Sequence, residues 1–482
     1  MHLMKFGGTS VGNADRVRQA AEIIEAQPLP RAAVVSAASG VTNLLLDAAA
    51  AASRHDVAAR VGAVTAIRDK HTDVLNGIGN PVERASALAV VDQLHAALDE
   101  ALDEISDAGE VSARLSDRVV STGEKAMSVM MAATLRSRGT PAVHAFADRI
   151  LATDDRFGSA RPNKDRTREQ AATLLPDLAA GTTVVLTGFI GGAPDGSTTT
   201  LGRGGSDYSA TLLGAALDAT EVQIWTDVPG VLSADPREVS DARVVPAISY
   251  DEAQELAHFG AKVLHPRTIR PAVSRGIPVR ILSTFAPEEP GTLVTREAHG
   301  EHVKAVTALK KLLLLTIDVP ELEDLAAASS HVFAALHHLR IEMIAVSQAS
   351  SRRRMTYLVD PGSHGDCDTV SRLLDDALEE SDVEAEIRCE SGIALVAAVG
   401  QGAAAQPSAL SKMLDVLTRA GVPVLSSSLQ HSNVALTAAV PASMADRAIL
   451  ALHEALILPN PQGGKSKRPR RSDLLAESMR VG

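Results

Sequence analysis

The chain has 482 residues, and its composition already narrows the classes of protein to which it can belong. This length is too great for one ordinary hydrophobic core, so it favours two or more domains. A formal net charge of −12 and an aromatic content of 2% argue against a nucleic-acid-binding surface and against an anionic membrane as a partner. Any site for a phosphorylated ligand must therefore be a local basic pocket.

The two cysteines and the N-terminus indicate where the protein works. Cys367 and Cys389 lack the spacing of a structural zinc site or of a disulfide framework, so we expect a reducing cytoplasm. The first residues contain no apolar signal region, and no later stretch reaches about 18 uncharged apolar residues. We expect neither secretion nor a membrane span.

Short apolar runs alternate with helical patterns over the first three hundred residues. Strands are expected at 32–36, 119–121, 182–186 and 222–226, and helices at 14–26, 81–108 and 206–216. This alternation predicts an α/β domain with a central, mostly parallel sheet flanked by helices. Ligands of such sheets bind at the carboxyl ends of the strands.

The pattern changes after a pause near residues 287–291. A strand, helix, strand, strand, helix order runs over 311–379 and repeats at similar lengths over 393–455, which predicts two copies of a small α+β module. We expect domains at 1–297, 305–385 and 386–460. The remaining residues, 461–482, include a basic, breaker-rich stretch and are predicted to be a disordered tail.

The opening segment is a candidate phosphate site. Lys5 ends a predicted strand and is followed by Phe6, Gly7, Gly8 and two hydroxyl residues before a helix that begins near Ala14. Glycines let the backbone approach an anion, helix N-terminal amides donate to it, and the lysine supplies a charge. The spacing is not that of a Walker motif, and a glycine turn beside a surface lysine remains the alternative for this segment alone.

Two further segments have related chemistry. A second glycine loop, Gly202 to Ser206, leads into a helix with Arg203 and Asp207 on either side of its start. The arginine offers a planar fork for a carboxylate, and the aspartate can orient a lysine or a metal ion. The third segment, Trp225 to Val231 with Arg237 after it, ends a strand in a turn of the kind that clasps a nucleotide.

Together these segments resemble the aspartate kinases of the amino-acid kinase family, from Lys5 to about Val294. The resemblance implies ATP-dependent phosphorylation of the L-aspartate β-carboxylate to 4-phospho-L-aspartate, the first step in making lysine, threonine and methionine. It also implies an amino-acid kinase fold, and Mg²⁺ as the companion of ATP without a dedicated protein metal site. A side-chain carboxylate is ionised at neutral pH and needs no general base to attack a phosphoryl group.

The resemblance carries roles onto matching positions. It implies Lys5 and Asp207 as catalytic residues, and Ser36, Thr42, Glu124, Arg203, Gly204, Gly205 and Ser206 as substrate-binding residues, with Glu124 pairing with the substrate ammonium. The implied ATP-binding residues are Lys5, Phe6, Gly7, Gly8, Thr226, Asp227, Leu232, Arg237, Lys262 and Val263. Leu232 departs from the family pattern because some relatives have a nucleotide-contacting tyrosine there.

The duplicated module resembles paired ACT domains with the order βαββαβ, which bind an end-product amino acid and associate into dimers. This likeness implies a homodimer or higher homo-oligomer, with L-threonine or L-lysine as the effector of feedback regulation. The first strand runs through Asp318-Val319 into Pro320-Glu321, where many relatives have a glycine-containing effector loop. The identity of the effector therefore stays open.

Two other functions compete with this interpretation. A kinase for acetylglutamate or a nucleotide would have no use for Glu124 as an ammonium partner. An inactive amino-acid sensor that works only through its C-terminal modules would not need Lys5, Arg203 and Asp207. An assay of ADP release with different acceptors separates the three.

Overall fold

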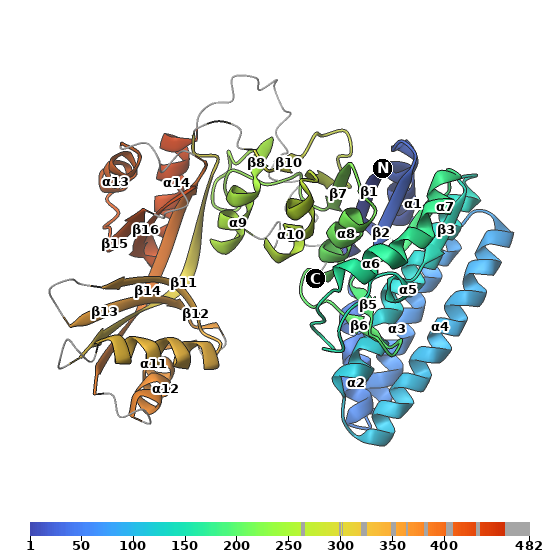
Figure 1. Ribbon diagram of the computed structural model, residues 1–482, viewed down its shortest axis with the longest axis horizontal. Helices are drawn as coiled ribbons and strands as arrows, with labels where there is room; N and C mark the ends of the chain where they lie inside the picture. The colour runs from blue at the N-terminus through green and yellow to red at the C-terminus, as the bar shows by residue number, and fades with distance from the viewer. Residues whose placement is uncertain are drawn as a thin grey trace.

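The computed structural model describes residues 1–261, 266–297, 300, 302–319, 325–348, 353–362, 365–379, 384–401, 408–429 and 434–457. Within them lie an eight-stranded sheet, a six-stranded sheet and a two-stranded hairpin. The two larger sheets stand at opposite ends of an elongated molecule, with the helix α9 (Tyr250–His258) between them (Figure 1). Among the described residues, no helix is long and apolar enough to cross a membrane.

The eight-stranded sheet has the order β3-β4-β2-β1-β7-β9-β10-β8 and is parallel except for the β9–β10 pair. Its strands are β1 (His2–Phe6), β2 (Arg31–Val35), β3 (Ala142–Ala145), β4 (Thr183–Thr187), β7 (Glu221–Thr226), β8 (Ala247–Ser249), β9 (Val279–Ser283) and β10 (Thr292–Thr295). All residues of β2 and of β4 are buried, as expected for parallel strands covered on both faces.

Helices cover both faces of this sheet. One apolar core joins it to α1 (Ala14–Ala26), α2 (Val41–Ser53), α3 (Val57–Asn76), α4 (Pro81–Ala108) and α5 (Ala113–Ser137). The other joins it to α6 (Lys164–Ala171), α7 (Leu175–Ala179), α8 (Gly205–Ala216), α9 and α10 (Pro266–Arg275). Successive residues of β1 alternate between them, because Leu3 lies in the second core and Met4 in the first.

The structure contradicts one predicted strand. Residues 119–121 lie inside α5, a helix of 25 residues whose middle is buried on nearly all sides. Val119 and Val120 form a short apolar run between the polar residues Arg118 and Ser121, and a short apolar run of this kind cannot be told from a strand by periodicity. The consequence is that Glu124 projects from within a buried helix.

The C-terminal sheet has the order β12-β13-β11-β14-β16-β15, and every pairing in it is antiparallel. Its strands are β11 (Ala305–Asp318), β12 (Glu342–Gln348), β13 (Arg354–Asp360), β14 (Glu386–Val399), β15 (Ser426–Leu429) and β16 (Ala435–Pro441). The helices are α11 (Leu325–His338), α12 (Cys367–Glu379), α13 (Ala409–Arg419) and α14 (Ala445–Leu456). The repeated strand, helix, strand, strand, helix order is confirmed, and β11 and β14 join the copies as the central strands.

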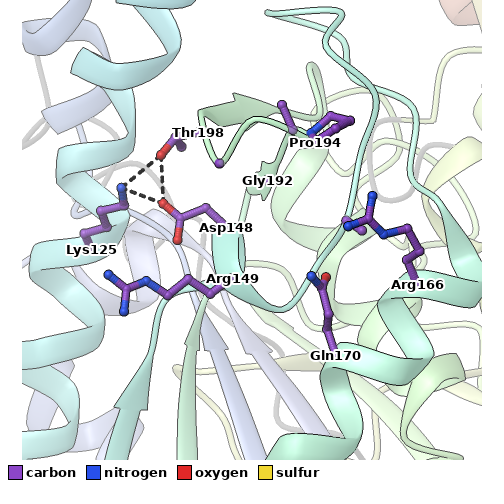
Figure 2. Close-up of a pocket in the computed structure, with 11 residues that line it drawn as sticks. Lys125, Asp148, Arg149, Arg166, Gln170, Gly192, Pro194 and Thr198 are labelled. Carbon is purple, nitrogen blue, oxygen red and sulfur yellow. Dashed lines mark hydrogen bonds and ion pairs between the residues drawn. The ribbon is translucent and has the colours of Figure 1, made fainter.

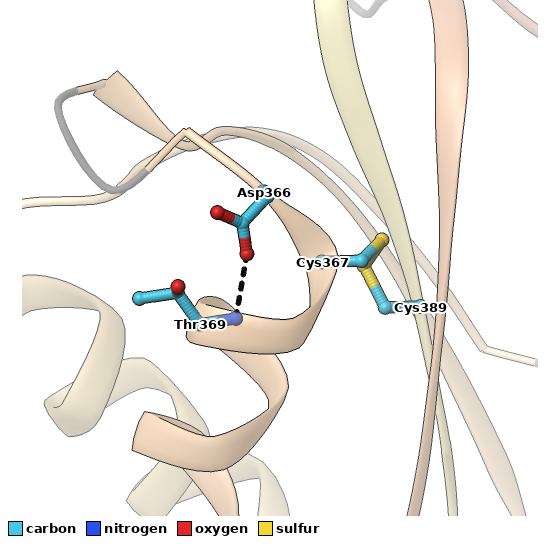
Figure 3. The surroundings of a disulfide bond; sticks show 4 residues. All are labelled: Asp366, Cys367, Thr369 and Cys389. Carbon is cyan, nitrogen blue, oxygen red and sulfur yellow. Dashed lines mark hydrogen bonds between the residues drawn. A yellow bond between two sulfur atoms is a disulfide. The ribbon is translucent and has the colours of Figure 1, made fainter.

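A disulfide between Cys367 and Cys389 corrects the expectation drawn from their spacing. Their sulfur atoms lie 2.03 Å apart, and the bond ties the first residue of α12 to β14 (Figure 3). The carboxylate of Asp366 accepts a hydrogen bond from the Thr369 amide at 2.8 Å and so caps the same end of the helix. The two cysteines are 22 residues apart in sequence, and only the packing of α12 against the sheet brings them together.

A buried ion pair connects the two sheets. Lys304, just before β11, lies 2.7 Å from the Glu252 carboxylate in α9, and neither side chain is more than 4% exposed. The other Glu252 oxygen accepts a hydrogen bond from the amide of Gln401, which follows β14, at 2.6 Å. Glu252 also completes a capping box with Ser249 at the start of α9. One side chain therefore holds α9 together with the segments that precede β11 and follow β14.

Candidate active site

The ends of four parallel strands meet at one edge of the large sheet. The Ser36 amide donates to the Phe6 carbonyl at 3.1 Å, and the Gly7 amide donates to the Trp225 carbonyl at 3.1 Å. The Gly188 amide, after β4, donates to the Val35 carbonyl at 2.8 Å. The loops that follow β1, β2, β4 and β7 are therefore joined directly, at the edge where such sheets bind ligands.

Two glycines allow these loops to approach one another. A Cβ atom on Gly8 would lie 2.9 Å from the Ala37 carbonyl oxygen. One on Gly188 would lie 2.8 Å from the Cβ of Ser206, at the start of α8. Any side chain at either position would push the loops apart, so the glycines are required by the close approach of backbone to its neighbours.

Lys5 and Asp207 form an ion pair inside this junction. The Lys5 Nζ lies 2.7 Å from Asp207 Oδ1, with the two side chains 11% and 21% exposed. Lys5 comes from β1, and Asp207 from the first turn of α8, where the helix dipole favours an acidic residue. The pair confirms that the two glycine loops come together, as the sequence predicts for a site that handles a phosphoryl group.

Glu124 reaches the same loops from α5. It is buried, its carboxylate accepts a hydrogen bond from the Ala37 amide, and its Oε2 is enclosed without a hydrogen-bond partner in the described structure. Burial raises the pKa of this carboxyl to about 7, and the hydrogen bonds from the Ala37 and Glu124 amides oppose the shift. A buried carboxylate with an unused oxygen is suited to receive a cation.

The remaining predicted substrate residues surround this centre. Ser36 and Thr42 are half-buried, and Ser206 faces Gly188. Gly204 has a left-handed φ of 70°, and it places the exposed Arg203 before the first turn of α8. Within the described part of the chain, the Arg203 side chain makes no ion pair or hydrogen bond, so its guanidinium is free to bind a carboxylate.

Sequence reasoning missed the residues that hold the hairpin β5 (Ile190–Gly192) and β6 (Thr198–Thr200), which leads to Arg203. Asp117 in α5 accepts hydrogen bonds from the Gly158 amide, the Thr200 amide and the Thr200 hydroxyl, each at 2.8 Å. Burial raises the pKa of Asp117, while these hydrogen bonds oppose the shift. Asp117 is one of several charged residues of α5, so no local pattern in the sequence singles it out.

A second anchor of the hairpin lies beside an open polar cavity of about 550 Å³ (Figure 2). Lys125 forms an ion pair with Asp148 at 2.7 Å, and the Thr198 hydroxyl donates to Asp148 at 2.7 Å. Arg149, Arg166 and Gln170 line the rest of the cavity. Lys125 and Glu124 are neighbours on α5. Lys125 anchors the hairpin through Asp148, whereas Glu124 contacts the strand-end loops.

The predicted ATP-binding residues Thr226, Asp227, Leu232 and Arg237 lie in the segment 226–245, which follows β7. We term it the nucleotide segment. The Thr226 hydroxyl donates to Asp227 at 3.1 Å, and Leu232 pairs with Val244 across a β-bridge. Arg237 is exposed, and its guanidinium hydrogen bonds within the described chain all go to Asp235. This partner raises the pKa of Arg237.

The structure tests some of these positions more closely than others. The hydrogen bond from the Gly7 amide to the Trp225 carbonyl joins the start of the segment to the glycine loop that follows β1. Within the described residues, Arg237 has no such contact with that loop. The other two predicted ATP contacts, Lys262 and Val263, lie outside the described residues.

Comparison with known proteins agrees with this class of site. The family model of the amino acid kinase family matches residues 1–283. The lysine-sensitive aspartokinase 3 of Escherichia coli is 33% identical over 461 residues, which cover 94% of this chain and 98% of that protein. The chain belongs to the amino acid kinase family and, within it, to the aspartate kinases.

Further relatives define the extent of the likeness. The crystal structure of E. coli aspartokinase III in complex with aspartate and ADP superposes with a TM-score of 0.78 at 32% identity, over 95% of this chain and 100% of that one. This match includes the C-terminal sheet and confirms the predicted kinase fold with ACT-like modules. The bifunctional aspartokinase/homoserine dehydrogenase of Haemophilus influenzae is 32% identical over 95% of this chain, which spans 56% of that protein's length.

Proposed function

We propose that the chain transfers the γ-phosphoryl group of ATP to the β-carboxylate of L-aspartate, giving 4-phospho-L-aspartate and ADP. The observation that carries this proposal is that the Lys5–Asp207 pair and the buried, partly unsatisfied carboxylate of Glu124 lie at the same strand-end loops, because Glu124 accepts from the Ala37 amide and the Ala37 carbonyl adjoins Gly8. A phosphate-binding cation and an ammonium-binding anion in one junction fit an acceptor that is a free amino acid. The relative crystallised with aspartate and ADP supports the same pair of substrates.

The phosphoryl transfer follows from these positions. A β-carboxylate oxygen of aspartate forms a bond to the γ-phosphorus as the bond from that phosphorus to the ADP oxygen breaks. Lys5 offsets the charge on the transferring group, and Asp207 holds the lysine ammonium in place. Because the acceptor is already ionised, no residue has to remove a proton.

Recognition of the amino-acid end is assigned to two groups of opposite charge. Glu124 receives the substrate ammonium on its unused oxygen, and Arg203 receives the α-carboxylate. A nearby ammonium lowers the pKa of Glu124 from its value of about 7, so substrate binding ionises this carboxyl. N-acetylated acceptors lack that charge and leave the carboxylate buried without a partner.

Mg²⁺ is proposed as the companion of ATP. No group of three or more His, Cys, Asp or Glu side chains that could hold a metal ion occurs among the described residues. Mg²⁺ binds nucleotide phosphates, waters and one or two carboxylates. Asp207 and Asp227 are the carboxylates that would hold it, and the bound ion neutralises phosphate charge.

An ADP-release assay tests the function. We expect release with L-aspartate, and only background release with N-acetyl-L-glutamate or without acceptor. Hydroxylamine should trap the acyl phosphate as a hydroxamate in proportion to ADP. Release that is independent of aspartate, or equal with acetylglutamate, would refute the assignment.

Regulation by an end-product amino acid is proposed for the C-terminal sheet. We place the kinase domain at 1–297, the ACT-like modules at 305–385 and 386–460, and a basic tail at 461–482. The structure of E. coli aspartokinase III with lysine and aspartate favours lysine over threonine as the effector. The residues of the edge strand β12 are mostly exposed, which suits pairing between two copies and a homo-oligomer. Initial rates that are unchanged by millimolar lysine and threonine would reject this regulation.

A further inference from the structure

The nucleotide segment is held at both ends by the kinase domain. At its start the Thr284 amide donates to the Thr226 carbonyl at 2.9 Å. Farther along, the Val231 amide donates to the Thr292 hydroxyl at 2.8 Å, and this hydroxyl donates to the Val245 carbonyl at 2.7 Å. These bonds fix where the segment leaves and rejoins the large sheet.

The middle of the segment packs instead against the C-terminal sheet and its helices. The amide of Val306 in β11 donates to the Ser233 carbonyl at 2.8 Å. Ala234 and Val239 are buried in the apolar core that β14, α13 and α14 build. Lys310 pairs with Glu238 of the segment and, at 2.6 Å, with Asp446 of α14. The same segment therefore packs as part of the regulatory module.

One buried hydrogen bond stands out among these contacts. The Ser233 Oγ lies 2.8 Å from Nε2 of His453 in α14, and the two residues are 1% and 5% exposed. The Arg243 amide donates to the same Ser233 oxygen at 3.0 Å. A hydroxyl oxygen can accept from this amide and still donate its own proton to the imidazole.

The acceptor role of His453 agrees with its charge state. Burial lowers the pKa of this imidazole, and the Arg243 side chain lowers it further, while Asp241 and Glu454 act in the opposite direction. The ring is then neutral at neutral pH, and in the tautomer protonated at Nδ1 its Nε2 accepts from the Ser233 hydroxyl. Ser233 directly follows Leu232, the residue at the position of the nucleotide-contacting tyrosine of some relatives.

We infer that His453 is a positioning residue for the nucleotide: its hydrogen bond to Ser233 holds the nucleotide segment in its binding conformation, so that ATP affinity depends on how α14 packs. This inference rests on the proposed function in taking ATP as the nucleotide and the segment 226–245 as part of its binding site. It makes the second module a structural part of the nucleotide site. A shift of α14 relative to β11 changes nucleotide affinity without contact to the aspartate residues.

The test uses the full chain and measures ADP affinity by calorimetry, together with kinase kinetics. His453→Leu removes the acceptor, and we expect the ADP Kd and the KM for ATP to rise about tenfold, with kcat at saturating ATP within about twofold of the parent. His453→Gln keeps an acceptor oxygen and should return the ADP Kd to within about threefold of the parent. A purely structural role would lower the active fraction and would not separate KM from kcat.

Two further variants keep the result decisive. Ile449→Val removes one methylene from the same helix and core without touching Ser233, so it should lower the melting temperature and leave the ADP Kd unchanged. Ser233→Ala removes the same hydrogen bond from the other side and replaces His453→Leu if that variant does not fold.

The inference fails if neither variant weakens ADP binding, if Ile449→Val weakens it equally, or if His453→Gln restores nothing. ADP binding is measured without aspartate. The ADP Kd values of the variants can therefore be interpreted even if the proposed kinase function is wrong.

Discussion

The two sheets of this molecule differ in what their strands expose. In the kinase sheet the residues of β2 and β4 are all buried, and function is confined to the loops at the strand ends. In the regulatory sheet the edge strand β12 is mostly exposed, and Val346 within it is 48% exposed. The parallel sheet fixes a chemical site through close backbone contacts, whereas the antiparallel sheet leaves an edge strand exposed.

The regions meet at two buried polar contacts, Glu252 with Lys304 and Ser233 with His453. Buried polar groups are costly to leave unpaired, so both contacts constrain how the sheets sit together. Substitutions at Lys304, Lys5 and Glu124 act on the contact between the regions, on catalysis and on substrate binding. Their separate effects show whether the two regions have different roles.

The largest effect on stability is expected at the junction. Lys304→Ala leaves the Glu252 carboxylate buried without its cation, which should lower the free energy of unfolding by about 3–5 kcal/mol. Urea denaturation measures this loss, with the exposed Lys412→Ala as the matched control. A loss below about 1 kcal/mol would mean that the two regions do not depend on this contact.

The largest effect on catalysis is expected at Lys5. Lys5→Ala should lower kcat about a hundredfold or more, with a modest change in the KM for aspartate, because the lysine acts on the transferring phosphoryl group. Steady-state kinetics at saturating ATP measure it, and Lys164→Ala at the exposed start of α6 serves as the control. Turnover near that of the parent would remove Lys5 from the mechanism.

A smaller effect is expected when Glu124 is made neutral. Glu124→Gln should lower kcat/KM for aspartate about thirtyfold, since an amide cannot neutralise the substrate ammonium. In the parent, kcat/KM should fall as the pH drops below about 7, the pKa of this carboxyl, and the variant should lack that limb. A variant with an unchanged KM for aspartate would place the ammonium elsewhere.

Glu124 should also affect folding stability, which changes with pH in the opposite direction to kcat/KM. Its folded pKa of about 7 lies above the ordinary value of 4.5, so the folded chain holds a proton that the unfolded chain releases between these values. The parent without aspartate should lose stability as the pH rises through this window, and Glu124→Gln should not. Melting curves between pH 5 and 8 distinguish the two, and parallel curves would contradict the burial argument.

A further change of stability with pH is expected in helices away from the site. His71 of α3 and His95 of α4 stack, with ring nitrogens 2.8 Å apart, and burial lowers the pKa of His71 to about 3. The unfolded imidazole binds a proton below about 6.5, so stability should fall as the pH drops from there towards 3, by at most about 1.4 kcal/mol per pH unit for His71.

This acid sensitivity can be assigned by substitution. His71→Phe keeps an aromatic ring without a proton site and should reduce the slope, whereas the exposed His338→Gln should leave it unchanged. Melting temperatures between pH 4 and 7 measure both slopes. Equal slopes in the parent and in His71→Phe would assign the acid sensitivity to other groups.

Helices with strong end signals could be predicted closely from the sequence. The predicted bounds of α1 and α4 match the structure, and α4 has Asn80 and Pro81 at its start and a left-handed Gly109 after its end. The glycine loops were also readable, because Lys5 and Asp207 stand in motifs whose chemistry requires them to meet. Local sequence determines both kinds of feature.

Features that depend on packing could not be predicted from the sequence. The strand expected at 119–121 is helical because these residues belong to the long helix α5, and so short an apolar run does not by itself distinguish a helix from a strand. The Cys367–Cys389 bond depends on the packing of α12 beside β14. Lys125, Asp148 and Thr198 come from distant segments, and none has a local pattern that predicts their contact.

The account's central claim is that one junction supplies both the cation for the phosphoryl group and the anion for the substrate ammonium. Phosphorus NMR of ATP turnover with L-aspartate and with N-acetyl-L-aspartate tests it most directly, because the two acceptors share the β-carboxylate and differ at the amine. We predict an acyl-phosphate signal with aspartate and none above background with the acetylated acceptor. Equal signals from both, or none from aspartate, would contradict the account.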